Sequence, residues 1–367
     1  MDDFPRILAA LGTEISTPAP IVLIDVVEEN ITRMQAFADA HGKAVRPHVK
    51  THKSVRIGKM QLDAGAIGLT AGTLSEAEIF AAAGCPDILL AYPLWITGAK
   101  EGRLRRLSRA TRLSVGAESA AAIERLAEVM GDAADALGIV IEVDCGARRS
   151  GVRPEDAGVL AAHATRLGLR ARGVFTYPGH GGTIGARESA AADQAAALRT
   201  AVESLRAHGI EPEIVSAGST PTAEFSTDPV ITEVRPGEYV FNDWDNVRLG
   251  DSAPQNIALF LASTVVSDQG HPHVILDAGT KALAREGNPE RGYGQVPSFD
   301  GYLRVLNEYH GFLELPAGGP RPVVGETVAV VPHHVCPVVN SFEELIITDR
   351  TGALLDRWPV DAQGRLN

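Results

Sequence analysis

The segment Arg46–Lys53, with the sequence Arg-Pro-His-Val-Lys-Thr-His-Lys, places one lysine, Lys50, directly after a short apolar run. A lysine at the tip of a strand can form a Schiff base with a carbonyl compound. His52 and Lys53 make the surroundings basic, and like charges nearby favour the neutral, nucleophilic form of a lysine. A basic cluster at the end of a strand is also typical of an ordinary solvated loop, so this segment alone leaves both interpretations open.

Other polar turns follow apolar runs further along the chain. They are Asp144–Gly151, in which Arg149 is the candidate residue, Tyr177–His180, in which Tyr177 and His180 are the candidates, and Gly218–Thr220. The last turn has the composition of a phosphate site. Gly218 allows a close approach of the backbone, and Ser219 and Thr220 add hydroxyl donors. A serine–threonine turn that opens a helix is also an ordinary N-cap.

A second kind of chemistry is indicated by the segment 331–340, Val-Pro-His-His-Val-Cys-Pro-Val-Val-Asn. On an extended strand, residues two apart point to the same side, so His334 and Cys336 can bind one ion while His333 points away. Imidazole and thiolate together suit zinc, with manganese or magnesium as alternatives, and two protein ligands leave positions open for water and substrate. Without other support, a single His-x-Cys pair in a β segment is usually accidental.

Eight apolar runs alternate with helical patterns between residues 44 and 241, and this alternation predicts the elements that position the polar turns. The predicted strands are Ala44–Val49, Ala66–Thr70, Ile88–Tyr92, Leu113–Val115, Ile139–Val143, Gly173–Tyr177, Glu213–Ser216 and Glu233–Phe241. Eight strand–helix units predict a (β/α)₈ TIM barrel, whose active site forms at the carboxyl ends of the strands. An earlier run, Ile21–Asp25, precedes the predicted helix Val26–His41 and is expected to pair outside this barrel.

After about Gly250 the chain consists of β-branched runs without helical periodicity, which predicts a second, C-terminal β domain. Its predicted strands are Ile257–Val266, His273–Leu276, Gly301–Leu306, Thr327–Val331 and Leu345–Thr348. We therefore expect a barrel over residues 22–248 and a β domain over residues 249–367, with residues 1–21 packed on the β domain.

The composition limits which partners and which kind of site the protein is expected to have. With 367 residues, of which 45% are hydrophobic, the chain can form well-packed cores. A net charge of −12 disfavours nucleic-acid phosphates and anionic membranes as partners. Three cysteines are too few for a disulfide framework, and neither a membrane-spanning run nor a basic leader is evident. We expect a cytoplasmic protein with a small-molecule site.

Taken together, these motifs resemble the fold-type III, alanine racemase-like pyridoxal phosphate (PLP) enzymes, and in particular their D-serine dehydratase and D-threonine aldolase group. The resemblance covers nearly the whole chain. It implies that Lys50 forms the Schiff base with PLP, that Arg149 contacts the cofactor ring, and that His334 and Cys336 bind a metal. It also implies PLP-binding roles for a further set of residues, Tyr177, His180, Gly218, Ser219, Thr220 and Tyr239, the last as a residue that lines the site. A homodimer is implied as well.

The resemblance further implies a small-molecule substrate, a D-amino acid with a β-hydroxyl group. In a dehydratase, Lys50 would remove the Cα proton while the metal helps the hydroxyl to leave. In an aldolase, the hydroxyl would lose its proton and the Cα–Cβ bond would break. A His-x-Cys pair accompanies dehydratases in this group and His-x-Asp accompanies aldolases, so Cys336 favours dehydration. An amino-acid racemase needs a second base and no metal, and a non-catalytic PLP-binding protein has no second domain.

Overall fold

A computed structural model of the protein describes residue 1 and residues 3–286 and 290–367. The chain forms two compact units. The β unit contains Met1–Thr32, Thr51–Arg56 and Glu238–Gly364, and the barrel unit contains Arg33–Lys50, Ile57–Gly237 and Arg365–Asn367. Lys50 is therefore the last residue of a barrel segment, and Thr51 begins a segment of the β unit. The continuous domains predicted from the sequence, 22–248 and 249–367, include positions outside the described residues, and their boundaries stay predictions.

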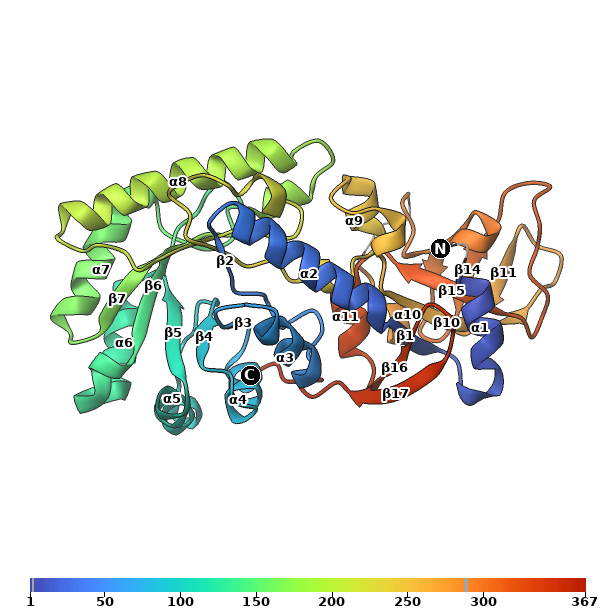
Figure 1. Ribbon diagram of the computed structural model, residues 1–367, viewed down its shortest axis with the longest axis horizontal. Coiled ribbons are helices and arrows are strands. Elements are labelled where there is room, and N and C mark those ends of the chain that lie inside the picture. Colours follow the sequence, from blue (N-terminus) through green and yellow to red (C-terminus); the bar gives the residue numbers. More distant parts are fainter. Residues whose placement is uncertain (2, 287–289) are drawn as a thin grey trace. The chain divides into compact units, whose positions relative to one another are not determined.

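In the barrel unit, whose residues are all described, eight strands form one parallel sheet in the order β2-β9-β8-β7-β6-β5-β4-β3 (Figure 1). They are β2 (Ala44–Val45), β3 (Leu69–Ala71), β4 (Asp87–Leu90), β5 (Arg112–Ala117), β6 (Gly138–Glu142), β7 (Arg170–Phe175), β8 (Ile214–Ala217) and β9 (Glu233–Val234). Backbone hydrogen bonds from Ile67 to Val45 and from Val49 to Thr70 also join the two ends of this order. The predicted barrel is confirmed, and each of the eight predicted strands overlaps an observed one.

Two of the strands, β2 and β9, have only two residues each, because each is soon followed by a proline. β2 ends before Arg46-Pro47, and β9 ends before Arg235-Pro236. Proline has no backbone N–H to donate to a neighbouring strand, so the ladder stops there. The predicted strand Glu233–Phe241 was therefore too long, and its second half forms the 3₁₀ helix η6 (Glu238–Val240) instead.

Helices connect the parallel strands, as the alanine-rich periodic segments predicted. They are α3 (Val55–Asp63), α4 (Leu74–Ala82), α5 (Gly98–Ala110), α6 (Ala120–Met130), α7 (Ala157–Arg166) and α8 (Arg187–Ala207), while α2 (Ile24–Ala40) begins in the β unit and leads into β2. Thr73 and Ser119 cap α4 and α6 by accepting backbone hydrogen bonds from the first turn of each helix. The strands beneath bury apolar side chains, among them Leu89, Val140 and Phe175.

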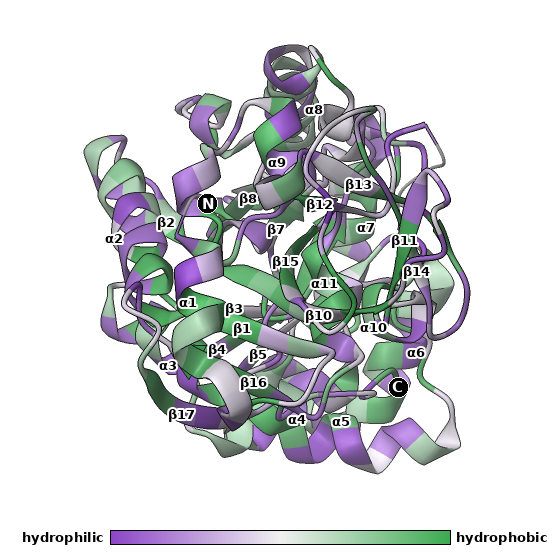
Figure 2. Cartoon of the chain, turned by 90° about the vertical axis from the view of Figure 1, so that its right-hand side faces the viewer, coloured by the Kyte–Doolittle hydropathy of each residue, from purple (hydrophilic) through white to green (hydrophobic). Residues whose placement is uncertain are grey.

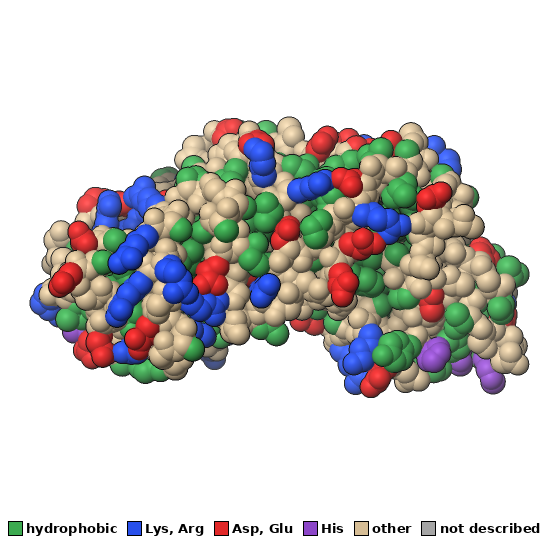
Figure 3. All heavy atoms as spheres, turned by 90° about the horizontal axis from the view of Figure 1, so that it is seen from below, with side chains coloured by type: hydrophobic (Ala, Val, Ile, Leu, Met, Phe, Trp, Pro, Cys, Tyr) green, Lys and Arg blue, Asp and Glu red, His purple; other side chains and the backbone are tan. Residues whose placement is uncertain are grey.

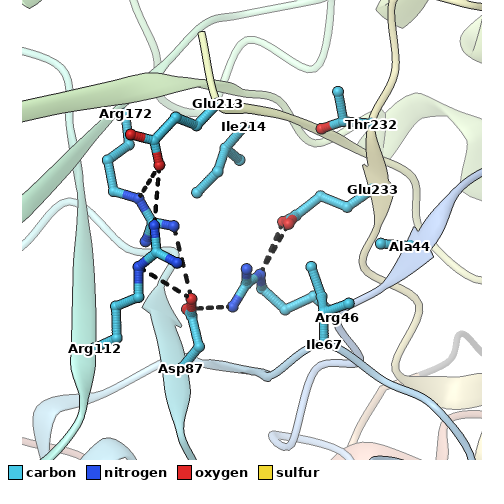
Figure 4. A pocket seen from close by; sticks show the side chains of 10 residues that line it. All are labelled: Ala44, Arg46, Ile67, Asp87, Arg112, Arg172, Glu213, Ile214, Thr232 and Glu233. Carbon is cyan, nitrogen blue, oxygen red and sulfur yellow. Dashed lines mark hydrogen bonds and ion pairs between the residues drawn. The ribbon is translucent and has the colours of Figure 1, made fainter.

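The amino-terminal ends of the barrel strands are held together by ion pairs rather than by apolar packing (Figure 4). Arg46 lies 2.6 Å from Asp87 and 3.0 Å from Glu233, and its side chain is almost completely buried. Arg172 and the half-exposed Arg112 contact Asp87 and Glu213. In a barrel of this kind the amino-terminal end serves stability, whereas the active site lies at the other end.

Arg46→Met should lower the free energy of unfolding by about 3–5 kcal/mol, because it leaves two buried carboxylates without their shared cation. Arg112→Met is the matched control. Its side chain is 52% exposed, so we expect a loss of about 1 kcal/mol or less. Urea unfolding of both variants measures the difference, and equal losses would contradict the importance of burial in this network.

The β unit contains nine strands among its described residues, in the order β11-β14-β13-β12-β15-β10-β1-β16-β17. They are β1 (Ala19–Leu23), β10 (Leu259–Ser267), β11 (His273–Leu276), β12 (Gly294–Val296), β13 (Gly301–Leu306), β14 (Gly311–Glu314), β15 (Thr327–Pro332), β16 (Glu344–Thr348) and β17 (Leu354–Pro359). The short helices of this unit are α1 (Phe4–Leu11), α9 (Trp244–Leu249), α10 (Thr280–Leu283) and α11 (Val335–Asn340). The five strands predicted after Gly250 are confirmed, while β12, β14 and β17 were not predicted.

Strand β1 is the surplus apolar run of the sequence, and it pairs in the β unit as expected. It lies between β10, to which it is antiparallel, and β16, to which it is parallel. All five of its residues are buried, and Figure 2 shows hydrophobic residues along β1 and its neighbours. The missed strand β17 is mostly exposed and mixes polar with apolar residues, so it lacks the apolar signal that identified the others.

On the face shown in Figure 3, acidic and basic side chains lie among one another. The net charge of −12 therefore does not produce a continuous acidic area on that face. Among the described residues, no helix has both the length and the apolar character needed to cross a bilayer.

Candidate active site

Four of the predicted site segments follow parallel strands of the barrel unit. Lys50 follows β2, Asp144–Gly151 follows β6, Tyr177–His180 follows β7, and Gly218–Thr220 follows β8. Because the strands are parallel, their carboxyl ends lie at the same edge of the barrel. The fold therefore brings these four segments to one end of this unit, as the sequence predicted.

Lys50, Arg149 and Tyr177 are close to one another at that end. The ammonium nitrogen of Lys50 lies 6.0 Å from the centre of the Tyr177 ring, and the guanidinium carbon of Arg149 lies 4.6 Å from it. Lys50 is exposed, so its amine is accessible to a small molecule. An amine, a guanidinium and an aromatic ring thus converge on one place.

The loop that carries Arg149 is held by two carboxylates. One oxygen of Asp144 accepts hydrogen bonds from the backbone N–H groups of Gly146 and Arg148, both at 2.9 Å. Ser150 donates to Glu142 at 2.7 Å, and burial raises the pKa of Glu142. The positive φ of Arg148 is uncommon for a residue with a side chain. This loop is therefore fixed on both sides of Arg149.

His180 lies in the 3₁₀ helix η4 (Gly179–Gly182) that follows β7. Its Nε2 is 3.1 Å from the carboxylate of Asp193, whereas its buried Nδ1 has no hydrogen-bond partner among the described residues. A buried polar atom without a partner costs free energy unless a bound group satisfies it. Gly146 is packed close to this ring. A Cβ atom added to Gly146 would lie 3.4 Å from the Cε1 atom of His180.

The turn Gly218–Thr220 offers hydroxyl groups. Gly218 has φ +86°, a conformation that a residue with a side chain rarely adopts. The backbone N–H groups of Gly218 and Ser219 donate to the side chains of Gln194 and Thr222. These two N–H groups are already engaged. The hydroxyl of Ser219 also lies 3.1 Å from that of Thr222, but a hydroxyl can turn toward a new acceptor, so a phosphate at this turn would be met by the hydroxyls of Ser219 and Thr220.

Arg235 lies at this same end of the barrel, and the sequence analysis gave it no role. Its guanidinium donates to the hydroxyl of Ser216 and to the carbonyl of Thr176, both at 2.7 Å. Burial lowers the pKa of Arg235 to about 10, which leaves the side chain charged at neutral pH. Arg235 follows β9, so it ties together the ends of three neighbouring strands.

In the β unit, Glu238, His334 and Cys336 offer ligand atoms that all lie within 4.8 Å of one another. The Nδ1 atom of His334 is 3.6 Å from Glu238, and the sulfur of Cys336 is 4.0 Å from the same carboxylate. A nitrogen, a sulfur and an oxygen donor in one cluster are suited to a divalent transition metal. The predicted pair comes together, and Glu238 is a third candidate ligand that the sequence analysis missed.

The predicted strand geometry of the metal pair was wrong. β15 ends at Pro332, His334 is the extended residue before α11, and Cys336 lies in the first turn of that helix. Pro337 is also in this first turn, where its missing N–H breaks no helical hydrogen bond. The Val-Cys-Pro segment therefore begins a helix. His333 does not belong to the cluster, as expected, and its ring is 3.5 Å from Asp245.

Asp243 holds the metal-pair segment in position. One of its oxygens caps α9 by accepting from the N–H of Asn246, and the other accepts from the N–H of Val335 at 3.0 Å. The second oxygen is also 3.5 Å from Nδ1 of His334. Asp243 and Glu238 therefore both face Nδ1 of His334, whereas Nε2 lies 3.4 Å from the exposed carboxylate of Glu286. A carboxylate in contact with the ring of a ligating histidine restrains the orientation of that ring. Asp243 is completely buried, so this contact is shielded from water.

The electric field in this cluster favours positive charge. Burial lowers the pKa of His334, but Cys336, Asp243 and Glu238 together raise it far above its ordinary value. Surroundings that retain a proton on imidazole so strongly will also attract a divalent cation. Tyr239, which the resemblance assigned to the site, lies in η6 directly after Glu238 and is buried.

The residues at the end of the barrel fit PLP by their chemistry. The aldehyde of PLP needs an amine, which Lys50 would provide, and its phosphate needs donors, which Ser219 and Thr220 would provide. The partnerless nitrogen of His180 is a further polar group that a bound molecule would satisfy.

Comparison with known proteins yields two family matches. Residues 22–243 match the family described as "Alanine racemase, N-terminal domain", and residues 258–348 match a "Putative serine dehydratase domain". Together these matches span most of the chain.

Curated relatives and solved structures agree with these matches. The chain is 36% identical over 354 residues to D-threo-3-hydroxyaspartate dehydratase of Delftia sp. strain HT23, covering 89% of this chain and 93% of the relative. It is 34% identical over 364 residues to D-threonine aldolase of Arthrobacter sp., covering 95% and 93%. The crystal structure of D-threonine aldolase from Filomicrobium marinum is similar with a TM-score of 0.88 and 28% identity, covering 96% of this chain and 97% of that one. Dehydratases and aldolases of this kind are both lyases.

Proposed function

Because the chain belongs to the alanine racemase N-terminal domain family of fold-type III PLP enzymes, and also carries a serine dehydratase domain, we propose that it is a metal-dependent dehydratase of β-hydroxy-D-amino acids. The observation that carries this proposal is the cluster of Glu238, His334 and Cys336, since it gives the protein a metal site in addition to the lysine of the family.

The barrel residues would hold the cofactor. Lys50 would bind its aldehyde carbon, and Arg149 and Tyr177 would hold its ring. His180 and the turn Gly218–Thr220 complete the proposed set, the turn serving the phosphate, and Tyr239 stays a proposed lining residue. When bound, PLP supplies an electron sink for negative charge at the substrate Cα.

Lys50 is the proposed general base. Its amine lies at the end of a segment held on both sides, by the backbone hydrogen bond from Val49 to Thr70 before it and by the buried Thr51 after it. A base fixed in this way reaches the Cα proton of one enantiomer and not of the other. This supports a preference for one enantiomer, and the names of the relatives indicate that it is the D-amino acid.

The metal would be held by His334 and Cys336, with Glu238 as a third ligand. The mixture of nitrogen, sulfur and oxygen donors supports zinc, because manganese and magnesium prefer oxygen ligands. When bound, the metal supplies a Lewis acid for the β-hydroxyl group of the substrate.

Retro-aldol cleavage to glycine and an aldehyde is the second candidate, supported by the 34% identity to a D-threonine aldolase. Dehydration is preferred because the metal pair contains a cysteine, Cys336, where we expect an aspartate in aldolases. The 36% identity to a dehydratase also supports it, although the two identities differ little.

Product analysis with D-threonine tests the proposal. A dehydratase should release ammonia and 2-oxobutanoate, whereas an aldolase should release glycine and acetaldehyde. D-Serine should likewise give pyruvate, and D-threo-3-hydroxyaspartate should be included because a relative is named for it. L-Threonine is the control and should react far more slowly. Glycine without any 2-oxo acid would establish the aldolase reaction instead, and interconversion of D- and L-alanine would establish a racemase.

The resemblance also supports a homodimer and a cytoplasmic location, which we add to the proposal. Light scattering on the purified protein should give a mass twice that of one chain, and a mass of one chain would refute the dimer.

A further inference from the structure

Thr51 contacts the metal cluster directly. Its hydroxyl oxygen lies 3.1 Å from the sulfur of Cys336, within hydrogen-bond distance for sulfur, and its side chain is completely buried in the β unit. The two residues are 285 positions apart in the chain. When Cys336 is a thiolate it has no proton to give, so the hydroxyl of Thr51 is the donor.

The segment that contains Thr51 is fixed to the end of the chain. Ala362 donates its backbone N–H to the carbonyl of Lys53 at 3.0 Å, and Val55 donates to the carboxylate of Asp361 at 2.7 Å. Lys53 also donates from its side chain to the carbonyl of Ala362 at 3.3 Å. The backbone that follows Thr51 is therefore held in place, so the direction in which its hydroxyl faces Cys336 is restricted.

The ligands of the cluster are thus supported by two different groups. Asp243 contacts His334, and Thr51 contacts Cys336. A hydrogen bond to a ligating group restricts its rotation and adjusts its electron donation, and loss of such a contact typically weakens metal binding 10–100-fold. Unlike Asp243, Thr51 directly follows Lys50 in the chain, and its backbone nitrogen forms the peptide bond to that lysine.

We propose that Thr51 is a positioning residue that orients the Cys336 thiolate for the metal and couples metal binding to the cofactor lysine. A shift of Cys336 on metal binding is transmitted to the hydroxyl of Thr51, and the next residue back along the chain is Lys50. Energetic coupling between two sites is reciprocal, so the metal and the cofactor should each change the affinity for the other. This inference rests on the proposed function, since it takes Lys50 as the cofactor lysine and Cys336 as a ligand.

Thr51→Val tests the inference, because it removes the hydroxyl and keeps the shape of the side chain. Thr51→Ser restores the hydroxyl. Thr348→Val is the matched control, since Thr348 is also completely buried in the β unit but donates to the carbonyl of Ala353. Holoenzyme is stripped of metal with a chelator and titrated with Zn²⁺ against a competing indicator, and the absorbance and circular dichroism of the bound cofactor are followed in the same titration.

We expect Thr51→Val to bind Zn²⁺ about 10–100-fold more weakly, and Thr51→Ser and Thr348→Val to bind it like the unaltered protein. Saturating Zn²⁺ should change the cofactor spectrum of the unaltered protein, and this change should be smaller in saturated Thr51→Val. Unaltered affinity in Thr51→Val would overturn the positioning role, and a cofactor spectrum indifferent to Zn²⁺ in the unaltered protein would overturn the coupling. If the unaltered protein binds no Zn²⁺, the proposed metal site fails and this inference fails with it. Normal Zn²⁺ binding together with an unaffected Thr51→Val overturns this inference alone.

Discussion

Lys50→Ala should abolish the covalent attachment of PLP and lower kcat for the D-amino acid substrate about 10³-fold or more. The substitution removes both the nucleophile that would hold the cofactor and the base that would take the Cα proton. Borohydride reduction of the unaltered protein, followed by peptide mapping, should place the pyridoxyl label on Lys50. The variant should carry no such label.

Lys59→Ala is the control for this experiment. Lys59 lies on the surface of α3 in a pair with Asp63, and its side chain is 72% exposed. Its removal should leave both labelling and turnover unchanged. A label found on Lys53 or Lys281 would refute the assignment of Lys50, even if Lys50→Ala were inactive.

His334→Ala and Cys336→Ala should each remove the bound metal and lower turnover about 10²-fold or more, since Lewis-acid assistance is worth several kcal/mol. The visible absorbance of the cofactor should persist in both variants, because Lys50, which would hold the cofactor, is unchanged. Metal content is measured by elemental analysis, alongside turnover of D-threonine and D-serine.

His310→Ala is the matched control, because His310 is an exposed histidine of the β unit outside the cluster. It should retain metal and activity. Full turnover by a chelator-treated sample that is verified to contain no metal would refute the catalytic role of the cluster. Glu238→Gln should give an intermediate loss of metal affinity if Glu238 is a third ligand.

The barrel and its catalytic edge could be predicted because their signals are local. Each strand is an apolar run followed by a helical pattern, and parallel strands place whatever follows them at one edge. Lys50, Arg149 and Ser219 therefore fell at the same end of the barrel. The lengths of β2 and β9 could also have been predicted, since Pro47 and Pro236 mark their ends in the sequence.

The supporting contacts of the metal cluster could not be predicted, because they join distant segments. The contact of Thr51 with Cys336 spans 285 residues, and that of Asp243 with Val335 spans 92. The residue pattern within one segment does not indicate which side chain of a distant segment will contact it. His334 and Cys336 were identified from residue type and spacing. The helix that begins between them was missed, although Pro337 in its first turn was a local signal for it.

The position of β1 in the β unit determines when this protein can complete its fold during synthesis. β1 leaves the ribosome long before its partners, since Ala19 pairs with Ala262 and Ile21 pairs with Ile346. At translation rates of about 5–20 residues per second, β1 waits roughly 10–50 s for its first neighbour. During that interval a fully apolar strand with two unpaired edges is exposed to other nascent chains. Chaperones that cover this segment during that interval should therefore raise the yield of native protein.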